Sequence, residues 1–255
     1  MTNADRFSLA GQYALVIGGS SGIGKAIAAG MLQAGARVII AGRQQDKLAL
    51  AVKELAAHGE VFGYQADVSE FGALRGLVGV TLAHHGRIDT LVNCQGITLL
   101  KPSEDFTPAD WDAIMATDLK SVFFACTEVG RHMLGRGSGA IINIASLASH
   151  RGWPGSALYA MAKSGVLSLT QTLAAEWAGR GVRVNAISPG FVMTDLNRDK
   201  MSPQRKALAL ARTPAGRFGE VDEMVGAAIY LASPGAGFVT GQSIAVDGGF
   251  LAGGM

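Results

Sequence analysis

The sequence predicts an α/β fold in which a doubly wound parallel sheet carries helices on both faces. Three observations predict it. Short apolar runs alternate with longer stretches of helical periodicity. A glycine-rich turn follows the first apolar run, and polar residues or glycine follow most later runs. No repeat or linker divides the chain, so residues 1–255 are expected to form a single domain.

The expected strands and helices follow this alternation in order. Strand-like runs occupy residues 13–17, 38–41, 61–64, 89–92, 140–144, 182–187 and 243–246. Apolar, β-branched runs of this length are typical of buried parallel strands. Helical patterns cover residues 25–33, 44–57, 70–84, 159–178 and 220–231, and a further helix contains Trp111 and Phe123. The polar stretch 197–212 is either a lid or a surface helix.

The glycine-rich turn separates the first strand from the first helix. It reads Gly18-Gly19-Ser20-Ser21-Gly22-Ile23-Gly24. Glycine permits a tight turn and close backbone approach, and a helix N-terminus offers free N–H groups and a positive dipole to a pyrophosphate. An ordinary turn with a glycine cap is the alternative. The strand–turn–helix context favours the phosphate cradle of a Rossmann-type sheet.

Six candidate ligand-binding residues each fall within three residues after a predicted strand. They are Gly18, Arg43, Asp67, Asn93, Ser146 and Pro189. In parallel sheets, ligands bind at the carboxyl ends of the strands, near the point where the strand order reverses. The sequence therefore predicts one ligand site along this edge.

Ser146, Tyr159 and Lys163 form a candidate catalytic group. Positions four apart on a helix share one face, so the phenol of Tyr159 and the ammonium of Lys163 can reach a common site. The lysine cation favours the phenolate form of the tyrosine, and a serine hydroxyl can hold the same substrate oxygen. The three groups suit proton exchange with an alcohol or carbonyl oxygen.

Together these segments resemble the short-chain dehydrogenase/reductase family over nearly the whole chain. The family's pattern Thr-Gly-x-x-x-Gly-x-Gly is met from Ile17 to Gly24, with Ile17 in place of Thr. Its Asn-Asn-Ala-Gly appears as Asn93-Cys94-Gln95-Gly96, so only the ends agree. Asp118 stands where members carry Asn, a residue whose backbone carbonyl holds a water linked to the catalytic lysine.

The resemblance implies an oxidoreductase that interconverts a secondary alcohol and a ketone with NAD(P)(H). It implies that Tyr159 is the general acid and base, that Ser146 orients the substrate oxygen, and that Lys163 supports Tyr159, with Asp118 beside them. The implied cofactor residues are Gly18, Ser20, Ser21, Gly22, Ile23, Gly24, Arg43, Asp67, Val68, Asn93, Gly96, Tyr159, Lys163, Pro189, Gly190, Val192 and Thr194.

The end of the second strand bears on the choice of cofactor. An acidic residue there would bind the adenosine ribose and repel a 2′-phosphate. The chain has Gly42-Arg43 instead, and an arginine can pair with that phosphate. NADP(H) is therefore favoured over NAD(H). In the alternative interpretation Arg43 faces solvent, and the glycine loop adds no second cation.

The substrate is less sharply defined. Residues 212–219 and 246–249 resemble both the gluconate 5-dehydrogenase type of sugar-acid and polyol dehydrogenases and the 3-oxoacyl reductases. Sugar-acid members often carry basic residues after the Asn93 segment, where this chain has Leu99-Leu100 and then Lys101. A neutral sugar, polyol or other ketone is therefore expected. The expected substrate contacts are Ser146, Gln95, Leu147, Trp153 and Tyr159, with His150 and Leu196 as further candidates.

Two other functions stay open: 3-oxoacyl thioester reduction, and dinucleotide binding by a non-catalytic regulator. A regulator has no need of the whole catalytic group, which argues against that function. The departures at Asp118 and at Cys94-Gln95 are its best support.

Composition bounds the remaining possibilities. Basic and acidic residues nearly cancel, 22 against 20, so no nucleic-acid partner is expected. No apolar run reaches membrane length, and two cysteines are too few for a disulfide framework, which favours the cytoplasm.

The resemblance implies a homotetramer, and low charge content fits subunit contacts. His84-His85 lie at a predicted helix end, where cations suit the helix dipole, so no metal site is expected.

Overall fold

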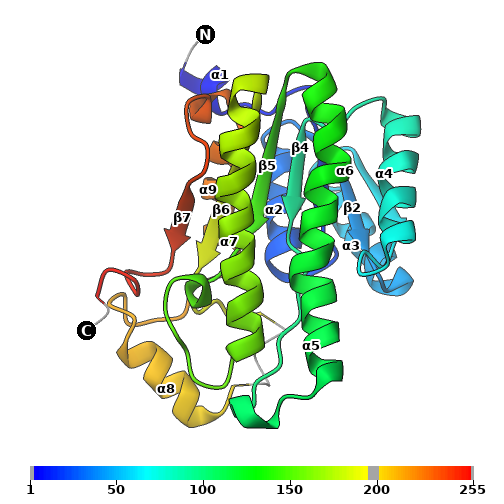
Figure 1. The fold of residues 1–255 in the computed structure, drawn as a ribbon. Coiled ribbons are helices and arrows are strands. Elements are labelled where there is room, and N and C mark those ends of the chain that lie inside the picture. Colours follow the sequence, from blue (N-terminus) through cyan, green and yellow to red (C-terminus); the bar gives the residue numbers. More distant parts are fainter. Residues whose placement is uncertain (1–2, 195–200, 254–255) are drawn as a thin grey trace.

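Seven parallel strands form one sheet in the order β3-β2-β1-β4-β5-β6-β7 (Figure 1). The computed structural model describes residues 3–194 and 201–253. The strands are β1 (Tyr13–Ile17), β2 (Arg37–Gly42), β3 (Val61–Gln65), β4 (Thr90–Asn93), β5 (Gly139–Ile144), β6 (Val182–Pro189) and β7 (Ser243–Val246). The predicted doubly wound α/β class is thereby confirmed.

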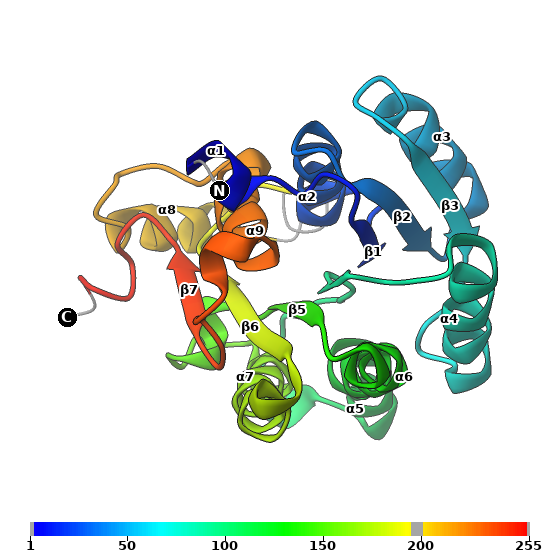
Figure 2. The same cartoon turned by 90° about the horizontal axis from the view of Figure 1, so that it is seen from above.

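Helices cover both faces of the sheet, as Figure 2 shows. One face carries α2 (Gly22–Gln33), α3 (Gln45–Leu55) and α9 (Val225–Ala232), and the other carries α4 (Phe71–His85), α6 (Ser121–Arg136) and α7 (Ala157–Trp177). The described residues also form three shorter helices: α1 (Asn3–Phe7), α5 (Pro108–Met115) and α8 (Pro203–Ala211). In the part of the chain described, no helix is both long and apolar enough to cross a membrane.

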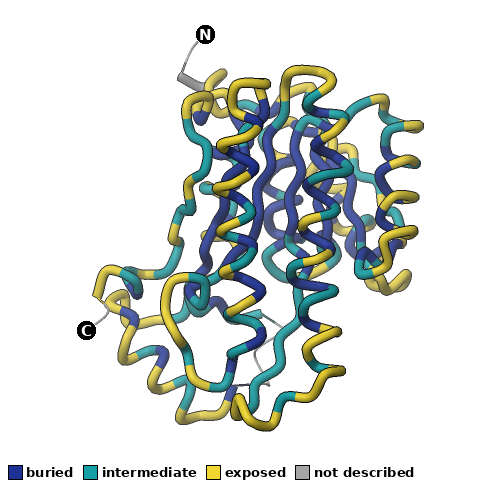
Figure 3. The backbone as a smooth tube through the Cα atoms, in the orientation of Figure 1, coloured by how far each residue is buried: buried dark blue, intermediate teal, exposed yellow. Residues whose placement is uncertain are grey.

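Each central strand contributes to two hydrophobic cores. Along β1, Leu15 and Ile17 pack with the residues of α4, α6 and α7, whereas Ala14 and Val16 pack with those of α2, α3 and α9. Side chains alternate across a strand, and a sheet covered on both faces needs apolar residues at every position. This explains why these runs read as continuously apolar, and why the central strands are buried in Figure 3.

The strand order reverses between β1 and β4. From β1 the chain proceeds to β2 and β3 in one direction, then returns to pair β4 with β1 on the other side, Ile17 opposite Asn93. Such a reversal leaves a crevice at the carboxyl ends of the two strands. In Figure 1 these ends point toward α5 and α8.

Three predicted helices differ in detail from the structure. The helix containing Trp111 and Phe123 comprises α5, a π turn over Ala116–Lys120 and then α6. The helix predicted at 220–231 begins as a 3₁₀ turn, Val221–Met224, and continues as α9. In the polar stretch 197–212, α8 begins at Pro203; residues 195–200 lie outside the described residues.

Candidate active site

The predicted cofactor residues line one long cleft at the carboxyl edge of the sheet. All of them except Asn93 contribute to its walls, so the cleft joins the ends of β1, β2, β4, β5 and β6. Further wall residues that the sequence did not single out are Ala41, Gly42, Gln44, Lys47, Ala66, Cys94, Ile97, Thr117, Ile144 and Ala145.

The glycine loop is packed so tightly that larger residues would not fit. Gly18 has a φ of +81°, and a β-carbon there would lie 2.8 Å from the backbone carbonyl of Cys94. A β-carbon at Gly24 would lie 2.3 Å from the Gly18 oxygen. The N-cap of α2, Ser21, makes no side-chain cap bond, so the first amides of the helix have no partner from it. The loop thus offers backbone N–H groups to an anion, as a bound pyrophosphate requires.

The side chains of Arg43 and Lys47 place two cations near the end of β2. The guanidinium of Arg43 is 4.0 Å from the carboxylate of Asp67, and its side chain remains 55% exposed. Lys47, four residues later in the first turn of α3, also lines the cleft. Sequence reasoning missed Lys47, which belongs to the helix that follows and not to the end of the strand. The two side chains make this end of the cleft able to bind a phosphate.

Ser146 and Tyr159 lie where the cleft meets a second pocket, and both residues line both cavities. Ser146 follows β5 and caps a short 3₁₀ turn, accepting a bond from the Ala148 N–H at 3.1 Å. Tyr159 and Lys163 lie one turn apart near the start of α7, with the lysine Nζ 5.8 Å from the centre of the phenol ring. The structure therefore brings the three predicted catalytic groups to one place.

Lys163 is held in a nearly solvent-free position. Its Nζ donates to the Ile144 carbonyl at 3.0 Å and lies 3.7 Å from Oδ2 of Asp118. The two side chains are 5% and 0% exposed. Burial opposes the lysine cation, but the charges of Asp118, Tyr159 and Cys94 together outweigh burial, and the pKa of Lys163 is raised. Burial likewise raises the pKa of Asp118, against the pull of the Lys163 cation.

The π turn determines where Asp118 lies. Asp118 is in the middle of the turn, and its Oδ1 accepts the Ile97 N–H at 2.8 Å. A β-carbon at Gly96 would lie 3.0 Å from Oδ2 of Asp118, so the glycine leaves room for the ion pair. Single π turns within α-helices occur frequently at functional sites.

Two residues of the Asn93–Gly96 segment lie elsewhere than expected. Asn93 does not line the cleft, because its amide points into the protein and donates to Oδ1 of Asn143 at 2.9 Å. Gln95 lines the cofactor cleft instead of the second pocket, since its amide donates to Ser121 at 3.1 Å. Asn93 ends β4 and Gln95 lies two residues later, and buried polar partners bind both side chains inside the protein.

The second pocket contains both aromatic and basic side chains. Its walls include the expected Leu147 and Trp153 and also Leu100 of the Leu99-Leu100 pair, together with Thr98, Arg151, Met201, Arg205 and Phe250. Leu99 packs in a small core with Ile114 and Leu158 and does not line the pocket. His150 contacts the Ser188 hydroxyl at 3.0 Å outside the pocket wall, and Leu196 lies outside the described residues.

A glycine-lined phosphate cradle beside a pocket that shares Ser146 and Tyr159 defines a dinucleotide-dependent oxidoreductase site. A family model of the short-chain dehydrogenase/reductase group, described as enoyl-(acyl carrier protein) reductase, matches residues 17–251. The chain belongs to the short-chain dehydrogenase/reductase family.

Three known proteins show the range of its relatives. D-threitol dehydrogenase of Mycolicibacterium smegmatis is 38% identical over 96% of this chain and 94% of its own. The 3-oxoacyl-[acyl-carrier-protein] reductase of Thermotoga maritima is 38% identical over 95% and 99%. A crystal structure of gluconate 5-dehydrogenase from Burkholderia cenocepacia J2315, in complex with NADP and tartrate, is 40% identical, with a TM-score of 0.94 over 98% and 99%.

The family settles the general activity. The chain is an oxidoreductase that acts on CH–OH groups of a small molecule with NAD(P). The expected resemblance and enzyme class are both confirmed, and a purely regulatory role is not the function of this chain.

Proposed function

We propose that this enzyme interconverts a secondary alcohol and a ketone of a sugar, polyol or related small carbonyl compound, with NADP(H) favoured over NAD(H). The observation that carries the proposal is the position of Ser146 and Tyr159, which line both the dinucleotide cleft and the second pocket. A substrate in that pocket would have its reacting carbon between the cofactor and these two hydroxyls.

The residues present fit a nicotinamide dinucleotide. The glycine loop suits the pyrophosphate, and Pro189, Gly190 and Thr194 line the same cleft and could contact a nicotinamide. When bound, the cofactor would supply the hydride acceptor or donor. The protein supplies the remaining chemistry.

In the oxidative direction, Tyr159 removes the proton of the substrate hydroxyl, and Ser146 donates a hydrogen bond that orients the same oxygen. Lys163 favours the phenolate form through its charge. Asp118 is a positioning residue: with the Ile144 carbonyl it fixes the Lys163 ammonium. In reduction Tyr159 returns the proton.

Tyr159→Phe is the direct test of the mechanism. The change should lower turnover at least a thousandfold, because the proton donor is lost. NADPH binding, followed by fluorescence titration, should change little. The wild-type enzyme and the variant are assayed by nicotinamide absorbance against polyols, sugars, sugar acids and a 3-oxoacyl thioester. A variant that keeps a tenth of the wild-type rate contradicts the role of Tyr159.

The cofactor preference rests on Arg43 and Lys47. Each cation can pair with a 2′-phosphate, and no acidic residue occupies the end of β2. The double change Arg43→Ala with Lys47→Ala should raise KM for NADP about 10- to 100-fold and leave KM for NAD within about twofold. Lys53→Ala, on the exposed side of the same helix, is the control. An equal loss for both cofactors contradicts the preference.

A second candidate function is reduction of a 3-oxoacyl thioester. It is favoured by the Thermotoga maritima relative and by the description of the matching family model. The same assay panel separates the two functions, since a thioester reductase would prefer the acyl substrate to every free polyol or sugar.

We also propose that the enzyme is a cytoplasmic homotetramer. Trp111, Phe123 and Met161 leave α5, α6 and α7 with side chains 46, 42 and 44% exposed, which suits a subunit contact. Both cysteines are free thiols, as a reducing compartment favours. Light scattering tests the assembly, and a particle of 26.3 kDa would contradict it.

A further inference from the structure

The π turn over Ala116–Lys120 takes from the Thr117 carbonyl the partner that it would have in an α-helix. In an α-helix the amide of Ser121 bonds to the carbonyl four residues earlier, which is that of Thr117. Here the Ser121 amide bonds to the Ala116 carbonyl, five residues earlier, as in a π-helix. Thr117 is buried, and a buried carbonyl that loses its hydrogen bond lowers stability. The turn therefore requires another donor.

The hydroxyl of Ser121 supplies that donor. Its Oγ donates to the Thr117 carbonyl at 2.5 Å, and Ser121 is 1% exposed. Because the hydroxyl proton is used in this bond, the Ser121 oxygen can only accept from its other neighbours. The side-chain amide of Gln95 meets this requirement, since its Nε2 donates to Ser121 Oγ at 3.1 Å. The hydrogen bonds thus run in one direction, from Gln95 through Ser121 to the π turn.

The segment from Gln95 to Ile97 contacts the same turn at two further points. The Ile97 N–H donates to Oδ1 of Asp118 at 2.8 Å. Gly96 leaves room for the other carboxylate oxygen, Oδ2, which would lie only 3.0 Å from a β-carbon at this position. Oδ2 in turn lies 3.7 Å from Nζ of Lys163. One short segment after β4 therefore binds both the carboxylate and the helical turn that carries it.

Gln95 keeps this position although one end of its amide is unsatisfied. Its Nε2 has two acceptors, Ser121 Oγ and, at 3.4 Å, Asn93 Oδ1, whereas the buried Oε1 bonds to no described residue. An apolar side chain of similar length would avoid an unsatisfied buried oxygen. The bonds made by the amide nitrogen explain the glutamine better than a gain in stability does.

We propose that Gln95 and Ser121 are positioning residues for catalysis: they fix the π turn, so that Asp118 stays beside the ammonium of Lys163. This inference rests on the proposed function, in which Lys163 supports Tyr159. It gives Gln95 a role in place of the substrate contact expected from the sequence. It also adds Ser121, which is absent from the described walls of both pockets.

The protonation of Lys163 provides the measurable signal. Among the described residues, the titratable groups that act on its ammonium are Asp118 from the π turn, Tyr159 from the same helix and Cys94 after β4. All three raise the pKa of Lys163, and burial lowers it. A carboxylate that moves away raises this pKa less, so Lys163 loses its proton at lower pH. The alkaline fall in kcat should then begin at lower pH as well.

The experiment measures kcat against pH for Ser121→Ala and Gln95→Met, with saturating NADP and the best substrate of the assay panel. Each change removes one bond of the series and should move the alkaline fall to lower pH by at least about 0.5 pH units. The melting temperature of Gln95→Met should stay within about 3 °C of wild type, because the unsatisfied oxygen is removed together with the nitrogen. Unchanged pH profiles in both variants overturn the inference.

Double variants show whether the effect passes through Asp118. When Asp118 is already replaced in Asp118→Asn, adding Gln95→Met or Ser121→Ala should cause no further pH shift, since the carboxylate to be positioned is gone. A second shift of the same size in the double variants means that the two residues act on Lys163 by another route, and it overturns the inference.

Thr81→Ala is the matched control for Ser121→Ala. The Thr81 hydroxyl is buried and donates to the Leu77 carbonyl at 2.7 Å, also four residues earlier, but within the regular helix α4. Its loss should leave the pH profile of kcat at the wild-type position. A shift in Thr81→Ala equal to that in Ser121→Ala would mean that loss of any buried helix bond has this effect, and the inference would be wrong.

Crystal structures separate this inference from the proposed function, because they do not depend on turnover. In Ser121→Ala and Gln95→Met, the distance from Asp118 Oδ2 to Lys163 Nζ should be longer than in a crystal of the wild type. A displaced carboxylate without turnover of any panel compound supports the positioning role and contradicts the proposed function. An unmoved carboxylate in both variants, with turnover of a polyol or sugar, overturns the positioning role and leaves the proposed function standing.

Discussion

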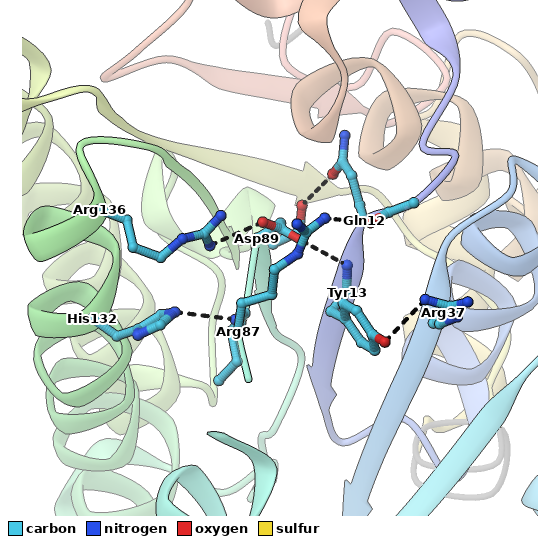
Figure 4. A network of polar contacts seen from close by, with 10 residues as sticks. Gln12, Tyr13, Arg37, Arg87, Asp89, His132 and Arg136 are labelled. Carbon is cyan, nitrogen blue, oxygen red and sulfur yellow. Dashed lines mark hydrogen bonds and ion pairs between the residues drawn. The ribbon is translucent and has the colours of Figure 1, made fainter. Parts of the chain in front are cut away.

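At the amino edge of the sheet, polar groups bind one another, whereas at the carboxyl edge several buried polar groups of the described residues lack a hydrogen bond. At the amino edge, Figure 4 shows a closed network around Asp89, which accepts from the Tyr13 N–H at 2.8 Å, from Arg87 at 2.9 Å and from Arg136 at 3.0 Å. Nearby, Arg183 donates to the Leu231 carbonyl at 2.7 Å at the end of α9. The charges at this edge are satisfied by the protein itself.

The carboxyl edge is where partners are missing. Four buried polar atoms of the described residues lack a hydrogen bond, and all follow the carboxyl ends of strands or lie beside them: Gln95 Oε1, Asp118 Oδ2, Ser149 Oγ and Trp153 Nε1. Buried polar groups without partners are rare, and each lowers stability. We infer that the amino edge stabilises the fold, whereas the carboxyl edge is less stable and carries the groups used for binding and chemistry.

Among the changes that test this comparison of the two edges, Ser146→Ala should have the largest effect, and the effect should be on rate. Loss of the hydroxyl that orients the substrate oxygen should lower kcat about a hundredfold. The melting temperature should shift by less than about 3 °C, because the hydroxyl caps only a short 3₁₀ turn. Ser149→Ala, in the same turn but outside both pocket walls, should keep the wild-type rate. Similar losses in both variants would mean that the turn, and not the hydroxyl, matters.

Asp89→Ala, at the amino edge, should lower stability and leave the rate unchanged. The change leaves the Tyr13 N–H and two guanidiniums without their acceptor and should lower the free energy of unfolding by about 2 kcal/mol. Denaturant unfolding measures this effect, with Asp112→Ala on exposed α5 as the control. The kcat of folded enzyme should equal that of wild type. A fall in kcat with no change in the free energy of unfolding would contradict the distinction between a stabilising amino edge and a catalytic carboxyl edge.

Asp118→Asn should have the smallest effect, seen mainly in the pH profile. The Asp118 carboxylate raises the pKa of Lys163, and burial lowers it. Without the carboxylate, Lys163 loses its proton at lower pH, so the alkaline fall in kcat should begin at lower pH, with kcat at neutral pH reduced no more than about tenfold. An unchanged profile would mean that Asp118 only fills space.

Much of the fold was predictable because its signals are local. The continuous apolar runs of β1, β2 and β5, and the glycine turn before α2, identify a buried parallel sheet without any long-range information. The division of the helix around Ala116–Lys120 was not predictable, since a π turn has the same composition as the α-helix around it. The single-domain interpretation and the roles of the site residues stay predictions.

The second pocket was less accessible from the sequence. Arg205 and Phe250 reach it from segments far from Ser146, and only tertiary packing brings them together. The inward turn of Asn93 depends on Asn143, a strand neighbour whose amide cannot be recognised as a partner from its position alone.

Because of the π turn, the position of Asp118 beside Lys163 can be changed without changing how the flanking helices pack, although a mutation usually affects both. Such a turn holds one residue more than an α-helical turn, so the helices before and after it keep the phase that they would have in an uninterrupted helix. We expect that deleting Thr117 would restore regular winding and leave Ile114 and Val122 in their cores. Asp118 would lose its place beside Lys163. We therefore expect that deleting this one residue would remove the ion pair and leave the fold unchanged.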